Sequence, residues 1–200
     1  EIEVNKYLIS NDLVEVKKID DGYLFDGKGS KYAIVFYPGA KVEYTSYAPL
    51  MSKIASNGID VYLVKMPFNI AFLGKNKADN IISDDYDNWY IMGHSLGGVV
   101  ASSYASGNDK IKGIILLASY PTKKIPDNIR LLSIYGTNDG VLNMKKYEES
   151  TKYFPSDSKK VEISGGNHAN YGNYGKQKKD KESTISREEQ QNKTVEEIIN

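Results

Sequence analysis

The chain has 200 residues, of which 40% are hydrophobic, and this length supports one well-buried core with little left for a second. We therefore expect a single domain over residues 1–200. Its 26 basic and 26 acidic side chains cancel to a formal charge of zero, which argues against binding to nucleic acid or to an anionic membrane surface. The sequence contains no cysteine, which excludes disulfides, thiolate metal sites and a cysteine nucleophile.

The sequence carries no apolar run of about eighteen residues, the length at which a segment is predicted to span a bilayer. It opens on Glu1, without the charged and apolar regions of a signal peptide. Because no initiator methionine is present, we expect that a leader or membrane anchor has been removed upstream of residue 1. An extracytoplasmic or membrane-anchored location in a bacterium, and otherwise a cytoplasmic one, therefore both stay open.

The first half of the chain predicts a hairpin followed by alternating strands and helices. Residues 12–26 alternate in hydropathy around a turn-prone Asp-Asp-Gly, which indicates two strands at a sheet edge. The apolar runs Tyr32–Tyr37 and Val61–Val64 are typical of strands buried on both faces. Apolar residues at helical spacing predict a helix over Tyr44–Asn57 between them, and a weaker pattern predicts another over Ala71–Ile82.

The second half continues this alternation. A strand leads into Ser95 and an apolar helix follows it; the later strands are predicted at Gly113–Ala118, Ile129–Tyr135 and Lys160–Ile163, with a helix over Leu142–Tyr153. Strands that are apolar on both faces, alternating with helices, favour an α/β fold. We predict a mostly parallel sheet covered by helices on both faces, with no cap domain.

The C-terminal part combines a flexible loop with a terminal helix. A glycine-rich loop runs from Gly165 to Gly175, and the lysine-rich stretch Lys176–Lys181 after it is interpreted as a solvated connector. Ser186 is a suitable N-cap for a helix. Val195, Ile198 and Ile199 form an i, i+3, i+4 stripe, which we expect to dock that helix on the sheet.

The motif Gly93-His-Ser95-Leu-Gly97 is typical of a nucleophile elbow, because it stands between an apolar strand and an apolar helix. A serine on so sharp a turn adopts strained backbone angles, and glycines two residues to either side let the strand and helix approach. The turn would expose the Ser95 hydroxyl and leave the N–H of Leu96 at the helix start, aimed at a developing oxyanion.

A serine hydroxyl needs a general base, and the sequence offers two histidines. His94 adjoins Ser95, where neighbouring side chains diverge, so we interpret it as a buried packing or hydrogen-bonding residue. His168 lies in a glycine-rich loop after the last predicted strand, where it can reach the carboxyl edge of the sheet. We therefore assign His168 as the base.

The base needs a carboxylate on its second ring nitrogen, which fixes the tautomer. Asp139 follows a strand and lies between Ser95 and His168 in the chain, which is the order of α/β-hydrolase triads. Asp127 and Asp157 are rivals, but both precede strands and should lie at the opposite edge of the sheet.

The loop after the first long buried strand should supply the second oxyanion donor, and we assign it to the N–H of Ala40. Aromatic and apolar residues that follow other strands are candidates for an acyl pocket; they are Met66, Phe68, Tyr120 and Tyr135.

Five motifs make the sequence similar to the small α/β-hydrolases of the dienelactone-hydrolase-like group. They are Phe36–Val42 (FYPGAKV), Tyr47–Leu50 (YAPL), Gly93–Gly98 (GHSLGG), Tyr135–Asp139 (YGTND) and Gly165–His168 (GGNH). The resemblance covers nearly the whole chain. It implies the sheet topology of these enzymes and the triad Ser95, Asp139 and His168, each carried on its own motif.

Relatives with a tail similar to residues 167–175 (NHANYGNYG) are bacterial proteins whose substrates are mostly unassigned, and some carry an N-terminal membrane anchor. This chain departs from the family pattern in the short stretch Pro121–Asn128, which leaves little room for the usual helix or lid. This short stretch therefore predicts an open, lidless site.

Taken together, these features predict a serine hydrolase that cleaves a carboxylic ester or related acyl bond in a small molecule, through an acyl-enzyme on Ser95. No metal and no cofactor is expected, and we expect a monomer. Acyl transfer or thioester hydrolysis at the same site stays open, as does a non-catalytic binding protein on a hydrolase scaffold.

Overall fold

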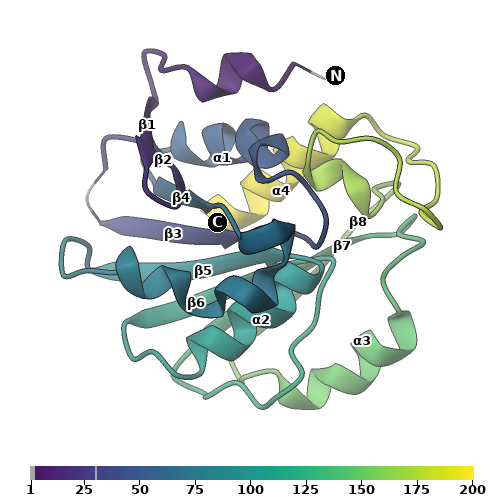
Figure 1. Cartoon of the computed structure of the whole chain (residues 1–200). Helices are drawn as coiled ribbons and strands as arrows, with labels where there is room; N and C mark the ends of the chain where they lie inside the picture. The colour runs from purple at the N-terminus through teal and green to yellow at the C-terminus, as the bar shows by residue number, and fades with distance from the viewer. Residues whose placement is uncertain (1–2, 30) are drawn as a thin grey trace.

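The computed structural model describes residues 3–29 and 31–200, which build an eight-stranded sheet with helices on both faces (Figure 1). The strands are β1 (Glu15–Ile19), β2 (Gly22–Asp26), β3 (Tyr32–Tyr37), β4 (Asp60–Val64), β5 (Asn88–His94), β6 (Ile111–Leu117), β7 (Arg130–Gly136) and β8 (Ser158–Ile163). The α-helices are α1 (Ala48–Ala55), α2 (Leu96–Ala105), α3 (Met144–Ser150) and α4 (Arg187–Ile199). Short 3₁₀ turns occur at Asn5–Leu8, Tyr44–Tyr47, Pro67–Asn69, Ala71–Asn80, Thr151–Tyr153 and Ala169–Tyr171.

The strands lie in the order β1-β2-β4-β3-β5-β6-β7-β8. β2 runs antiparallel to β1 and to β4, while every other neighbouring pair is parallel. The predicted edge hairpin and mostly parallel sheet are therefore confirmed. The chain moves from β3 to β4 on one side and to β5 on the other, so the loops after β3 and β5 diverge. Such a switch point opens a crevice at the carboxyl edge, where ligands of α/β sheets bind.

Strand β3 is apolar throughout because both of its faces are covered. Ile34 and Phe36 of β3 pack in the cluster that includes α1 and Val195 of α4. Ala33, Val35 and Tyr37, which point the other way, pack with α2 on the opposite face. Figure 1 shows α1 and α4 on one side of the sheet and α2 on the other.

The helix predicted over Ala71–Ile82 is present as a 3₁₀ helix over Ala71–Asn80, which a non-helical Gly74 interrupts, and not as a regular α-helix. Its buried side is lined only by the small residues Ala71, Gly74 and Ala78, whereas Phe72 and Leu73 face solvent. A stripe of small residues buries too little apolar surface to hold a regular amphipathic helix on the core.

The terminal helix begins as predicted, since the hydroxyl oxygen of Ser186 accepts the N–H of Glu189 at 3.0 Å. Val195 and Ile198 pack against the core, but the predicted docking of Ile199 is wrong, because this last helical residue is 43% exposed. The longest helix, α4, has 13 residues. Within residues 3–29 and 31–200, no helix combines the length and the apolar character that crossing a bilayer requires.

Packing of α1 gives a stability prediction. Ile54 is fully buried, whereas Ile9 on the N-terminal segment is 67% exposed. Ile54→Ala should lower the free energy of unfolding by about 2–5 kcal/mol, because it leaves a cavity. The matched change Ile9→Ala should alter it by less than about 0.5 kcal/mol. Urea unfolding of both variants is the measurement, and equal losses would contradict this account of the core.

Candidate active site

Ser95 occupies a strained turn between β5 and α2, with φ 53° and ψ −125°. The two flanking glycines are needed for space. A Cβ on Gly93 would lie 2.5 Å from the Gly97 carbonyl carbon, and one on Gly97 would lie 2.3 Å from the carbonyl oxygens of Tyr37 and Pro38. The predicted nucleophile elbow is thus present in its backbone geometry.

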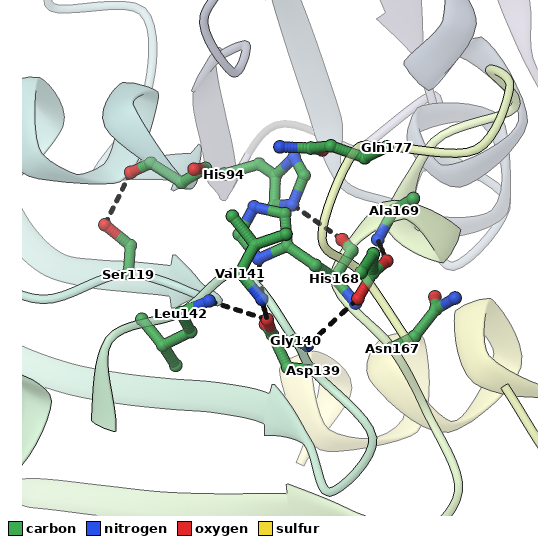
Figure 2. A network of polar contacts seen from close by, with 12 residues as sticks. His94, Ser119, Asp139, Gly140, Val141, Leu142, Asn167, His168, Ala169 and Gln177 are labelled. Carbon is green, nitrogen blue, oxygen red and sulfur yellow. Dashed lines mark hydrogen bonds and ion pairs between the residues drawn. The ribbon is translucent and has the colours of Figure 1, made fainter. Parts of the chain in front are cut away.

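Strand β6 and the residues just after it hold the Ser95 turn by two hydrogen bonds. The Ser95 N–H donates to the Leu117 carbonyl at 2.9 Å, and the Ser95 carbonyl accepts the Ser119 hydroxyl at 2.6 Å. Figure 2 shows Ser119 directed at the turn. Gly98 makes this approach possible, because a Cβ there would lie 2.4 Å from the Ser119 hydroxyl oxygen.

The structure brings Asp139 and His168 together at the carboxyl edge of the sheet. The Nδ1 of His168 lies 2.8 Å from Oδ2 of Asp139, and the two side chains are 1% and 2% exposed. The second oxygen, Oδ1, accepts the N–H groups of Val141 at 2.8 Å and Leu142 at 2.7 Å (Figure 2). Because both carboxylate oxygens are held, the imidazole is kept in one orientation with Nδ1 as its donor.

The other ring nitrogen of His168 is the one that a general base must use. Nε2 is buried and, among the described residues, has no hydrogen-bond partner, Ser95 included. A buried polar atom without a partner is uncommon and needs an explanation, and a catalytic role is one such explanation. Contacts between a nucleophile and its base are often long before substrate binds.

Two backbone N–H groups qualify as oxyanion donors. Leu96 is the first residue of α2, so its N–H has no acceptor within the helix. In the loop after β3, Gly39 donates to the Tyr47 hydroxyl and Lys41 donates to the Asn69 carbonyl. The N–H of Ala40, between them, has no hydrogen-bond acceptor in the described part of the chain. The N–H groups of Leu96 and Ala40, the two predicted oxyanion donors, are therefore available to bind an oxyanion.

His94 has the buried hydrogen-bonding place that the sequence indicated. Its Nε2 lies 2.9 Å from the carbonyl oxygen of His168, which only accepts, so Nε2 carries the proton. Its Nδ1 then accepts the Tyr47 hydroxyl at 2.7 Å, and the oxygen of that hydroxyl accepts the Gly39 N–H at 3.1 Å. Burial, followed by the electrostatic influence of nearby His168, holds the pKa of His94 well below its ordinary value. His94 is therefore neutral.

Sequence reasoning missed three residues that support this arrangement. Tyr47 links His94 to the loop of Gly39, and Gln190 on α4 pairs with both backbone polar groups of Asn167, next to His168. Asp180 accepts the backbone N–H of His168 at 3.2 Å. Tyr47 begins the YAPL motif, which carries no signal for a contact with His94, and Gln190 has no sequence signal. Asp180 lies within Lys176–Lys181, so the interpretation of that stretch as a solvated connector is wrong for this residue.

The four candidate pocket residues differ in exposure. Met66 is 1% exposed and packs in the core with residues of α2, so it offers no surface to a substrate here. The Tyr135 hydroxyl donates to Glu162 and its ring packs against Tyr147. Tyr120 is partly exposed and Phe68 is 88% exposed.

The rival carboxylates lie away from His168, as predicted. Asp157 pairs with Arg130 at 2.9 Å, and Asp127 accepts the N–H of Ser156. Over residues 3–29 and 31–200, no group of three or more histidine, aspartate or glutamate side chains is arranged to hold a metal ion.

Comparison with known protein families identifies the family of this chain. Residues 33–192 match the model of the alpha/beta hydrolase family. The chain belongs to that family. Comparison with curated proteins gives no match. Among solved structures, the chain is similar to a predicted CIB-like hydrolase from Thermoplasma acidophilum, with 17% identity, a TM-score of 0.63, and coverage of 92% of this chain and 96% of the other.

A likeness at 17% identity establishes the fold alone. The predicted α/β-hydrolase fold, a mostly parallel sheet covered on both faces, is confirmed. Membership of the narrower dienelactone-hydrolase-like group stays a prediction.

The buried His94 gives a prediction for stability in acid. Its folded pKa lies below the unfolded value of about 6.5. Between these two values the unfolded chain binds one more proton, so the contribution of His94 is complete above about pH 6.5 and is lost as the pH falls. The free energy of unfolding of the wild type should therefore fall more steeply below pH 6.5 than that of His94→Gln, by up to about 1.4 kcal/mol per pH unit.

Urea unfolding at several pH values between 5 and 8 measures both slopes. Because other titrating groups are common to the two proteins, their effect cancels in the difference. Parallel curves would show that His94 is not held neutral in the folded chain.

Proposed function

We propose that this alpha/beta hydrolase is a serine hydrolase that cleaves a carboxylic ester or related acyl bond of a small molecule. The observation that carries the proposal is the buried Asp139–His168 pair, whose free Nε2 belongs to the same edge of the sheet as the strained Ser95 turn. A nucleophile elbow, an oriented imidazole and two free N–H groups are the parts that acyl transfer through a serine requires.

In the first half-reaction, Nε2 of His168 accepts the proton of the Ser95 hydroxyl while the serine oxygen attacks the carbonyl carbon of the ester. The N–H groups of Ala40 and Leu96 stabilise the negative charge that develops on the carbonyl oxygen. Asp139 keeps the Nδ1–H oriented and stabilises the imidazolium. The imidazolium then donates its proton from Nε2 to the leaving alkoxide, which leaves an acyl group on Ser95.

In the second half-reaction, Nε2 accepts a proton from water, whose oxygen attacks the acyl carbon. The tetrahedral intermediate collapses, the Ser95 oxygen takes the proton back from His168, and the carboxylic acid is released. A thiolate leaving group or an acceptor other than water would use the same steps, so thioester hydrolysis and acyl transfer are the nearest alternatives. A non-catalytic binding protein is the alternative from another class.

The roles of the three residues predict a graded loss of activity. Ser95→Ala and His168→Ala should each lower kcat by about 10⁴-fold or more, and Asp139→Asn somewhat less, because serine and base act as a unit. Ester hydrolysis and covalent labelling by a fluorophosphonate probe measure this. Ser103→Ala, a serine on α2, is the control and should retain both.

Two outcomes would overturn the assignment. If the wild type neither labels nor hydrolyses any ester or thioester, the protein is a binding protein on this scaffold. If a folded His94→Gln variant loses more activity than His168→Ala, then His94 is the base.

The loop between β6 and β7 predicts the size of the acyl group. Residues 118–129 contain no helix, so this loop supplies no lid with an apolar underside. A long acyl chain would gain only where its methylenes are buried, at about 0.8 kcal/mol each. We therefore expect kcat/KM for nitrophenyl esters to be highest at roughly C2 to C6, with no jump in rate when substrate forms micelles.

A series of esters from acetate to palmitate tests this expectation. Activity that rises to C12 or beyond would mean that another surface binds the chain. Phe68, Phe72 and Leu73, which are 88%, 62% and 59% exposed, are the apolar side chains that offer such a surface. Phe68→Ala would then lower activity on the long esters alone.

A further inference from the structure

Asp180 lies in the loop between the Ala169–Tyr171 turn and α4, and its carboxylate is bound by four backbone N–H groups. Oδ1 accepts from Gly140 at 3.1 Å, from His168 at 3.2 Å and from Lys181 at 3.0 Å. Oδ2 accepts from Ala169 at 2.9 Å. Hydrogen bonds from N–H groups to a charged carboxylate are about twice as strong as those between neutral groups.

Three of these donors come from the two segments that carry the proposed acid–base pair. Gly140 follows Asp139 directly, and the other segment supplies the backbone of His168 itself and of Ala169. The loop of Asp180 also passes very close to Gly140, where a Cβ would lie 2.3 Å from the Lys179 carbonyl oxygen. The Asp180 carboxylate therefore links the backbone of His168 to the backbone of Gly140, the residue after Asp139.

The charge of Asp180 is balanced by backbone dipoles. Among the described residues no lysine, arginine or histidine side chain forms an ion pair with it, although lysines surround it in the sequence. The neighbouring carboxylate, Glu182, instead pairs with Lys176 in solvent, its side chain being 79% exposed. Such a ring of N–H groups around an anion holds its position without a flexible cationic partner.

We propose that Asp180 is a positioning residue of the active site, which holds the segments of Asp139 and His168 at the separation that keeps Nδ1 bonded to Oδ2 and Nε2 free. The proposal rests on the proposed function. Asp180 touches neither the substrate nor the reacting atoms, so its loss should lower kcat and leave KM nearly unchanged. The His168 segment should stay folded without it, because Gln190 binds Asn167 independently.

The test compares Asp180→Ala and Asp180→Asn with Glu182→Gln as the matched control, which removes a carboxylate from the same loop. We expect kcat to fall by about 10²-fold in Asp180→Ala, as for a small misplacement of catalytic groups. Asp180→Asn keeps one acceptor oxygen but turns an NH₂ group toward a backbone N–H, so its loss should be about 10-fold. Glu182→Gln should stay within about 2-fold of the wild type.

A second arm separates positioning from general destabilisation. In an Asp139→Asn background, Asp180→Ala should cost less than about 3-fold, because residues that act on one another are not additive. Equal losses in both backgrounds, or a loss explained by a lowered Tm in thermal unfolding, would overturn the proposal.

A third arm does not depend on activity. The proton between His168 Nδ1 and Asp139 gives a downfield ¹H resonance in NMR, which Asp139→Asn assigns by removing it. This resonance should broaden or move upfield in Asp180→Ala and stay in Glu182→Gln; an unchanged resonance would overturn the positioning role. If the wild type shows the resonance but no labelling of Ser95, the proposed function fails while the positioning role is still tested.

Discussion

The hydrogen bonds of one uncharged imidazole, that of His94, join the three segments on which the site is built. Through Tyr47 it reaches the loop of Gly39, and through its Nε2 proton it reaches the backbone of His168. Along the chain it is the residue next to Ser95. A protonated ring would turn its Nδ1 acceptor into a second donor, and the Tyr47 hydroxyl would then lose the acceptor of its own proton. Burial, which disfavours the charged form of His94, therefore also preserves this pattern of hydrogen bonds.

Much of this arrangement could be predicted from the sequence because its signals are local. The turn of Ser95 is predicted by Gly93 and Gly97, two residues to either side. A Cβ on either glycine would clash with neighbouring backbone atoms. Asp139 and His168 each follow a strand, so a parallel sheet alone places both at the carboxyl edge. Their mutual contact at 2.8 Å agrees with the order of serine, aspartate and histidine along the chain.

The parts that escaped prediction depend on contacts between distant segments. Met66 follows a strand as a pocket residue would, yet the turn beyond it folds back and buries its side chain. Ala71–Ile82 has helical spacing, but only a folded core reveals that its inward face consists of small residues. Asp180 is surrounded by lysines, which indicates solvent, and three of its four donors lie 11 to 40 residues away. Contacts between residues that are distant in the chain leave no periodic pattern in the sequence.

The two hydrogen bonds between the Gln190 side chain and the backbone of Asn167 also bear on the order in which the site forms as the chain is synthesised. On the ribosome, β5, α2 and β6 emerge before α4, so the residues that build the Ser95 turn are made first. The segment of His168 gains its hydrogen bonds to Gln190 after α4 has been made and has docked behind it. A growing chain that already holds the Ser95 turn therefore still lacks this support for the proposed base.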